Sequence, residues 1–217
     1  GRNILNPALT ARAFVFFSYP VSMSGNIWVA GAEAVDGITG ATALAVNTEG
    51  GSSLFSTLSD QGFSLSNLFF GFVPGSIGET SALCCLIGAV FLMVTRIGNY
   101  RIILGGIAGL VITAILFYLL PGTRGTWADA GPLYHLCAGG FLFGVSFMAT
   151  DPVSAPGTDP GRWIYGFLIG FLTVILRVAN PAFAEGVMLA ILFMNVFAPL
   201  LDHLVMKHRI SKRIPNV

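Results

Sequence analysis

The sequence contains three long stretches in which no charged residue occurs. They cover residues 13–32, 102–123 and 130–150, and they hold 20, 22 and 21 residues. An α-helix needs about 20 largely apolar residues to cross the hydrocarbon core of a bilayer. The alternation of polar and apolar residues that is typical of a membrane β-strand is absent. The chain is therefore predicted to be an all-α, polytopic membrane helix bundle.

Composition excludes several other classes of protein. Of the 217 residues, 54% are hydrophobic and only 10% are charged, whereas a soluble domain carries about 25% charged residues. Intrinsically disordered chains are poor in apolar residues, so disorder is excluded as well. The 11 basic and 10 acidic residues nearly cancel, which leaves no basic surface for nucleic acid. Cys84, Cys85 and Cys137 lie in apolar stretches without the spacing of a zinc site or a disulfide framework.

About six membrane spans are predicted, within a single membrane domain over residues 1–217. Their approximate bounds are 11–30, 79–95, 102–120, 132–150, 163–179 and 184–205. The apolar segment 63–74 is too short to cross a bilayer and ends in Pro74-Gly75, which predicts a re-entrant half-helix. Because the chain begins with Gly-Arg-Asn rather than Met, we expect it to be part of a longer protein.

The distribution of lysine and arginine predicts an orientation, since short cytoplasmic loops carry an excess of both residues. With six crossings, one face of the bundle receives most of them: Arg2, Arg12, Arg96, Arg101, Arg162, Lys207, Arg209, Lys212 and Arg213. This face, together with the C-terminus, is predicted to be cytoplasmic. The connection 31–61 and the loop 121–131 are predicted to lie on the opposite face, and Arg124 and Arg177 depart from the pattern.

Four acidic residues lie in or beside the predicted spans. Asp151 and Asp202 lie at cytoplasmic span ends, where they could supply oxygen ligands to a sodium path or act only as helix-end and turn carboxylates. Glu79 and Glu185 lie at span starts on the other face, where a carboxylate stabilises a helix N-terminus. Arg177 could neutralise a phosphate or an acid from that face.

Glycines are frequent inside the third, fourth and fifth predicted spans. Small residues at such spacing let helix backbones approach closely, so we expect them to serve packing. They are Gly105, Gly106, Gly109, Gly139, Gly140, Gly144, Gly166 and Gly170.

The segment Asp36-Gly37-Ile38-Thr39-Gly40-Ala41-Thr42 follows the first predicted span. On chemistry alone it is a tight turn whose exposed amides could accept a phosphate, or a loop whose threonine caps a short helix. The segment also resembles the D-G-x-[ST]-G-A-T flavinylation motif of the sodium-pumping NADH:quinone reductase and Rnf complexes. In those complexes a flavin transferase esterifies FMN, through its phosphate, to the last threonine. The resemblance implies covalent FMN on Thr42.

Further segments extend this resemblance, in order, over nearly the whole chain. They are Arg2–Thr10, Phe72–Ser81 with a P-G-S-x-G-E-x-S turn, Met148–Ser154 with M-A-T-D-P-V, and Asn180–His203. The chain is therefore similar to the NqrB/RnfD family. The pair Asp202-His203 is closer to NqrB than to RnfD, and the similarity is to the C-terminal part of NqrB.

The resemblance implies an architecture like that of urea transporters, with inverted repeats and re-entrant segments. The expected function is electron transfer from flavin to ubiquinone, coupled to sodium export and driven by NADH. Riboflavin bound without a covalent link is a further expected cofactor, whose contacts, like those of quinone, are expected in the missing N-terminal part. Expected partners are the other membrane and NADH-oxidising subunits and the flavin transferase. The expected location is the bacterial inner membrane, with the flavin-bearing loop periplasmic.

Other functions stay open at this point. An RnfD-type flavoprotein is disfavoured by Asp202-His203, and a passive urea or small-solute channel of the same fold would not need the flavinylation motif. Two Asn-Pro-Ala segments, at Asn6 and Asn180, resemble those of aquaporins. Their positions at span boundaries give a water channel little support.

Overall fold

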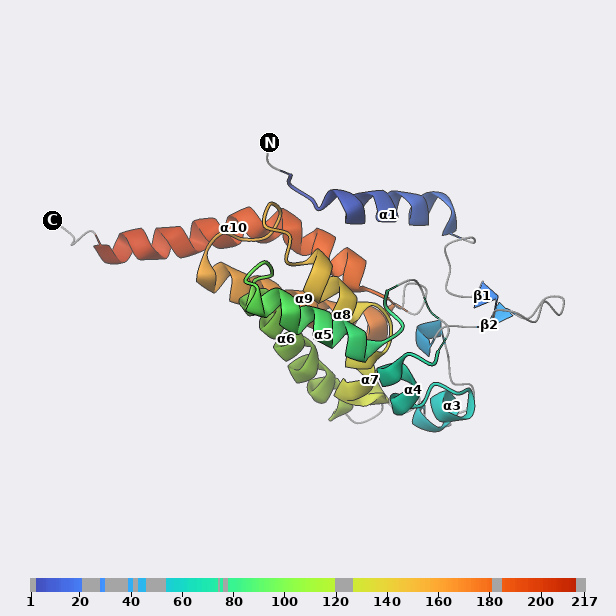
Figure 1. Ribbon diagram of the computed structural model, residues 1–217. Coiled ribbons are helices and arrows are strands. Elements are labelled where there is room, and N and C mark those ends of the chain that lie inside the picture. The colour runs from blue at the N-terminus through green and yellow to red at the C-terminus, as the bar shows by residue number, and fades with distance from the viewer. Residues whose placement is uncertain are drawn as a thin grey trace.

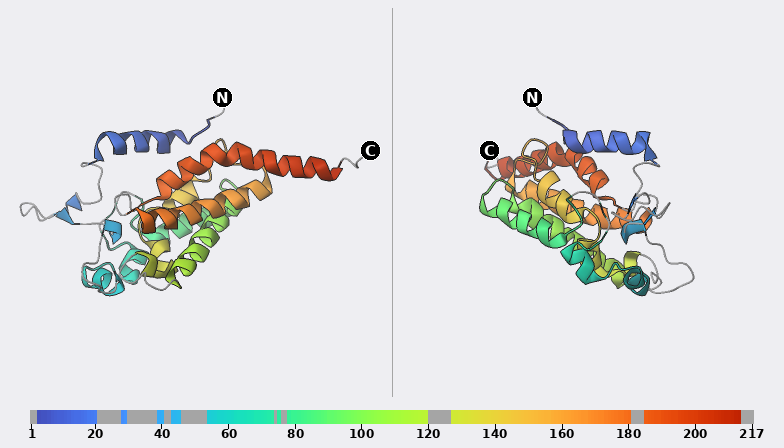
Figure 2. Two further views of the ribbon diagram at one scale, coloured as in Figure 1. Left: turned by 180° about the vertical axis from the view of Figure 1, so that it is seen from behind. Right: turned by 45° about the vertical axis from the view of Figure 1, so that its right-hand side comes forward.

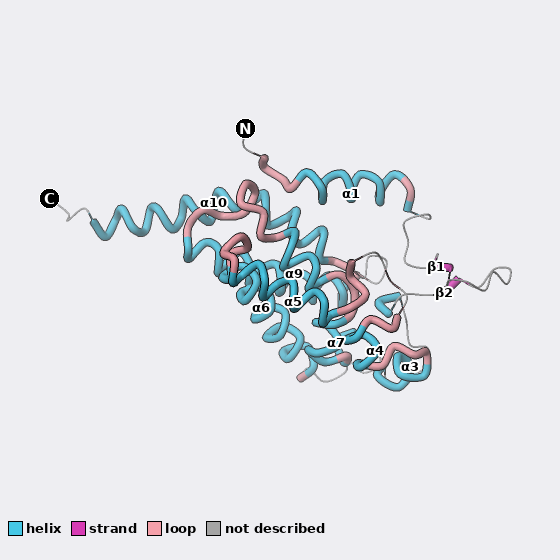
Figure 3. The backbone as a smooth tube through the Cα atoms, viewed as in Figure 1, coloured by secondary structure: helices cyan, strands magenta, loops and turns pink. Residues whose placement is uncertain are grey.

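The computed structural model describes residues 3–20, 28–29, 39–40, 43–45, 54–73, 75, 78–119, 127–180 and 185–213. These residues are mostly helical, and the strand pairing among them is the two-residue antiparallel pair β1–β2 (Figure 3). The elements are α1 (Pro7–Ser18), β1 (Trp28–Val29), β2 (Thr39–Gly40), η1 (Ala43–Ala45), α3 (Leu54–Asp60), α4 (Leu65–Phe70), α5 (Ala82–Val94), α6 (Tyr100–Tyr118), η2 (Trp127–Asp129), α7 (Gly131–Cys137), α8 (Phe141–Phe143), the π-helix η3 (Gly144–Met148), α9 (Asp159–Ala179) and α10 (Val187–Arg213).

Three helices in the described residues are long and apolar enough to cross a membrane. They are α6, α9 and the part Val187–Ser211 of α10, and a fourth span results if the bent pair of α7 with α8–η3 is counted as one. Helices α1 and α5 lie at the first two predicted spans but have only 12 and 13 residues. The helical membrane class is thus confirmed, whereas the six-span count and the urea-transporter-like repeat stay predictions.

The predicted fourth span, over 132–150, is not one continuous helix. Helix α7 ends at Cys137, and α8–η3 continues after a bend of 66°. The break lies at Ala138–Gly140, where Gly139 has a φ of +67°. This is the left-handed region, which glycine enters without steric cost. Because the three residues are small, the hydropathy pattern carries no sign of the break.

Helices α6 and α9 pack at backbone distance, as the glycine pattern predicts. A Cβ atom at Gly109 would overlap the carbonyl of Phe167, and one at Gly170 would overlap the backbone of α6. With Gly105 and Gly166, these residues form one G-x-x-x-G pair on each helix, the arrangement that brings membrane helices close together. The N-terminal ends of both helices lie together, since Arg101 contacts Asp159 at 3.1 Å.

Helix α1 begins earlier than the first predicted span. The Asn6 side chain accepts hydrogen bonds from two amides of the first turn at 3.0 and 3.4 Å, and Pro7 takes the first helical position. Arg12 therefore lies inside α1, not in front of a span, and its guanidinium contacts Glu185 at 3.5 Å. Helix α1 packs along α10 at the edge of the bundle (Figure 2).

The short elements after α1 gather at one end of the molecule. Figure 1 shows β1, β2 and α3 at this end and the C-terminal end of α10 at the opposite end. The segment 63–74, predicted as a half-helix, contains the six-residue α4, which Ser64 caps and which ends at Gly71 with a φ of 94°. That α4 re-enters a bilayer stays a prediction.

Candidate functional site

The flavinylation motif lies only partly within the described residues. Thr39 and Gly40 form β2, which pairs with β1. The remaining motif residues lie outside the described part of the chain: Asp36, Gly37, Ile38, Ala41 and Thr42. The described residues on either side of Thr42 are β2, which ends at Gly40, and η1, which begins at Ala43.

Leu44, on η1, reaches the break of the α7–α8 span. Its side chain fills the space that a side chain at Gly139 would occupy, since a Cβ there would overlap Leu44 Cδ1. Leu44 is 6% exposed and belongs to the apolar core that also contains Ala138 and Phe141. Leu44, two residues after Thr42, is thus packed against the break.

Two charged side chains form hydrogen bonds with the backbone carbonyls and the backbone amide that the break leaves without helical partners. Arg177, on α9, is 1% exposed and donates from Nη1 and Nη2 to the carbonyls of His135 and Ala138. Glu185 Oε1 accepts from the amide of Gly140 at 2.9 Å. A cation at a helix C-terminus and an anion at an N-terminus both complement the helix dipole. The two side chains therefore stabilise the break from opposite sides.

Glu79 lies beside Glu185 at the same place. A Cβ at Gly140 would contact a carboxylate oxygen of each, so the two carboxylates face one small space. The second oxygen of Glu185, Oε2, lies 3.5 Å from Nη2 of Arg12. Glu185 was predicted to stabilise the start of its own helix. Its carboxylate also accepts a hydrogen bond at the start of α8, 45 residues earlier in the chain.

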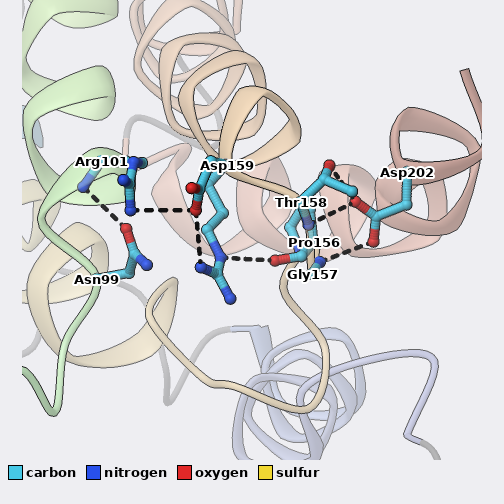
Figure 4. A network of polar contacts seen from close by, with 8 residues as sticks. Asn99, Arg101, Pro156, Gly157, Thr158, Asp159 and Asp202 are labelled. Atoms are coloured by element: carbon cyan, nitrogen blue, oxygen red, sulfur yellow. Dashed lines mark hydrogen bonds and ion pairs between the residues drawn. The ribbon is translucent and has the colours of Figure 1, made fainter. Parts of the chain in front are cut away.

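At the other end of the bundle, Asp202 on α10 binds the connection between η3 and α9 (Figure 4). Its carboxylate accepts from the amide of Gly157 at 2.7 Å, and from the amide and hydroxyl of Thr158 at 2.9 and 2.5 Å. Asp151 binds an earlier part of this connection, accepting from the Val153 amide at 3.2 Å and the Ser154 hydroxyl at 2.7 Å. The two candidate sodium ligands therefore both hold the connection 149–158.

Basic residues gather at this same end. Asp159 Oδ1 lies 3.1 Å from Arg101 Nη1 and 3.3 Å from Arg162 Nη1, and Arg162 Nε donates to the Pro156 carbonyl at 3.0 Å (Figure 4). Asn99 caps the start of α6 beside them, accepting from the Arg101 amide at 3.0 Å. Two of the positive residues that predicted the cytoplasmic face, Arg101 and Arg162, thus share one end of the bundle with Asp202, whereas Arg12 lies beside Glu185 at the break.

Sequence reasoning missed the break and the residues that meet there. The pair Gly139-Gly140 and the charge of Arg177 inside an apolar span were the available signals. On α7, the Nε2 atom of His135 lies 2.7 Å from the Trp127 carbonyl oxygen. Among the described residues, no group of three or more His, Cys, Asp or Glu side chains could hold a metal ion.

These features define a helical membrane protein. In the part of the chain that the structure describes, a broken span is held by the buried guanidinium of Arg177 and the partly buried carboxylate of Glu185. The chain belongs to the NQR2, RnfD, RnfE family, whose model matches residues 1–211.

Relatives are similar to the chain over almost all of its length. The NqrB protein of the Na(+)-translocating NADH-quinone reductase from Chromohalobacter salexigens is 50% identical over 215 residues, which cover 99% of this chain and 50% of that protein. The corresponding NqrB proteins of Ectopseudomonas mendocina and Yersinia pestis are 48% and 46% identical, covering 99% and 98% of this chain and 52% and 51% of theirs. The chain thus spans about half the length of these relatives.

Proposed function

We propose that this chain is the C-terminal half of the NqrB protein of a Na⁺-translocating NADH:quinone reductase, and that it carries FMN as a phosphoester of Thr42. The observation that carries the proposal is the motif Asp36–Thr42, in a chain whose relatives are NqrB proteins. The packing of Leu44 against the broken span supports it, because the segment next to the attachment residue has a defined place in the membrane domain.

The residues around Thr42 suit a bulky phosphoester. The Thr42 hydroxyl is the oxygen that such a bond requires, and its neighbours Gly40, Ala41 and Ala43 are small. FMN held there would supply the electron-transfer chemistry of a flavin. The chain's own part is to hold and orient the group, since β2 ends two residues before Thr42 and η1 begins directly after it.

Flavin fluorescence on a denaturing gel tests the attachment. Protein from cells that contain the flavin transferase is expected to give a fluorescent band, and Thr42→Ala is expected to abolish it. Thr39→Ala is the matched control, since it removes a hydroxyl from the same motif and should keep at least part of the signal. A fluorescent Thr42→Ala band would contradict the attachment site. A wild-type protein without the band would favour a passive solute channel.

The proposed setting is the bacterial inner membrane, within a complex that also contains the NADH-oxidising and other membrane subunits. Electrons would pass from NADH through the flavins to ubiquinone, with a riboflavin held elsewhere in the full-length protein. The motif would face the periplasm, and the C-terminus the cytoplasm. Single cysteines at Thr48 and Asn216 test this orientation with an impermeant thiol reagent on intact cells. If the reagent labelled residue 216 from outside and did not label residue 48, the predicted orientation would be reversed.

Asp151 and Asp202 are proposed to assist sodium entry from the cytoplasmic end. A sodium ion that leaves water needs oxygen ligands, and both carboxylates hold the connection that starts α9. Asp151→Asn and Asp202→Asn are expected to raise the sodium concentration for half-maximal quinone reduction about tenfold, with FMN still attached. An unchanged sodium curve for both variants would place the ion path elsewhere.

A further inference from the structure

The residues that directly follow Thr42 are buried. Ala43 and Leu44 are 5% and 6% exposed, although η1 has only three residues. Leu44 shares its apolar core with Tyr134 and Cys137 of α7 and with Phe141 of α8. A three-residue turn has too few hydrogen bonds to hold a fixed position by itself. The contacts of Leu44 with the membrane domain must therefore supply that position.

Gly139 provides the seat for Leu44. Because Gly139 has no side chain, Leu44 Cδ1 can enter the space beside its Cα atom. Arg177 borders this space and fixes the backbone around it; its Nη2 lies 3.4 Å from the point that a Gly139 Cβ would occupy. Its guanidinium donates to the carbonyl of Ala138, the residue before the glycine, at 2.9 Å. Leu44 thus contacts a fixed part of the broken span.

We propose that Leu44 is a positioning residue, which fixes the flavin-bearing Thr42 against the break between α7 and α8. This inference rests on the proposed attachment of FMN to Thr42. Thr42 precedes Leu44 by two residues, and consecutive Cα atoms are about 3.8 Å apart, so the covalent chain alone limits the separation of the two residues to about 8 Å. Seating Leu44 confines the phosphoester to a small region beside the break. Electron transfer slows steeply with distance, so a fixed position for the attachment segment would keep the flavin at a constant distance from its redox partner.

The accessibility of residue 43 measures the seating directly. Ala43→Cys is introduced into the full-length protein, in its complex, on a background without Cys84, Cys85 and Cys137. Its reaction with a water-soluble maleimide is followed by the mass of the peptide that contains residue 43. With Leu44 present the reaction is slow, and Leu44→Ala is expected to accelerate it about tenfold or more, since the apolar contact that closes the segment is removed. Leu44→Met keeps the apolar volume and should restore slow labelling.

Two further variants test the seating. Gly139→Ala leaves Leu44 unchanged but fills the seat, and is expected to accelerate labelling of residue 43 as Leu44→Ala does. Because residue 139 has a φ of +67°, alanine also strains the backbone there, so a second variant controls for general stability. Leu58→Ala is the matched control, because Leu58 is a fully buried leucine on α3. It should leave the labelling rate unchanged.

Leu44→Ala is expected to keep the covalent flavin band, to accelerate labelling and to slow quinone reduction several-fold. Leu44→Met is expected to restore slow labelling and normal quinone reduction. Equal labelling rates in all variants would overturn the inference. So would acceleration by Leu58→Ala to the same extent, or normal quinone reduction in an unseated Leu44→Ala protein. A parent protein without covalent flavin would instead contradict the proposed function. The two failures can be distinguished, because the labelling rate measures the packing of Leu44 whether or not flavin is bound.

Discussion

Replacing Asp202 by asparagine should weaken the junction between α10 and the start of α9. The Asp202 carboxylate accepts three hydrogen bonds, from the Gly157 amide and from the amide and hydroxyl of Thr158. Asparagine keeps one acceptor oxygen, but its NH₂ group faces an N–H donor and the negative charge is lost. A hydrogen bond to a charged group contributes about 1.5–3 kcal/mol. Because this site is partly exposed, which weakens charge interactions, we expect the free energy of unfolding to fall by about 1–2 kcal/mol.

For a chain of this length, each kcal/mol lowers the midpoint of thermal unfolding by about 2–4 °C. The expected shift for Asp202→Asn is therefore about 2–8 °C, measured on the purified complex with verified flavin content. An unchanged midpoint would refute the reasoning from the three hydrogen bonds.

A second substitution separates stability from sodium dependence. Thr158→Val removes the shortest of the three hydrogen bonds and keeps the carboxylate of Asp202. If the carboxylate contacts sodium, only Asp202→Asn raises the sodium concentration for half-maximal quinone reduction. If both variants raise it equally, Asp202 acts on sodium only by holding the connection to α9.

Two further predictions concern the packing of the spans. Arg177→Met should lower the free energy of unfolding by about 3–5 kcal/mol, because it leaves two carbonyls of the break without donors and removes the charge beside Glu185; a midpoint within about 2 °C of the parent's would contradict this. Gly109→Ala should cost about 1–3 kcal/mol, because its Cβ would overlap the Phe167 carbonyl. The matched control Ala108→Leu changes an exposed position of the same helix and should leave the midpoint within about 1 °C.

The starts of several helices are set by local contacts, although the predicted span bounds did not include these caps. Asn99 and Ser81 cap α6 and α5, and Asn6-Pro7 starts α1, because capping depends on atoms only two or three residues away. The glycine spacing predicted close helix packing in the third to fifth spans, since a small residue at every fourth position produces a flat helix face. That α6 and α9 are the two partners came from the structure.

The sequence by itself determined the class of the protein, because burying a charge in lipid is costly and long uncharged stretches leave little choice but membrane helices. It also determined the family, through the order of its motifs. Only the tertiary structure decided where the fourth span breaks and which residues hold the break. Glu185 and Gly140 are 45 residues apart, and Arg177 and His135 are 42 apart. Such partners are chosen by the packing of the whole bundle, and no local pattern of residues encodes that choice.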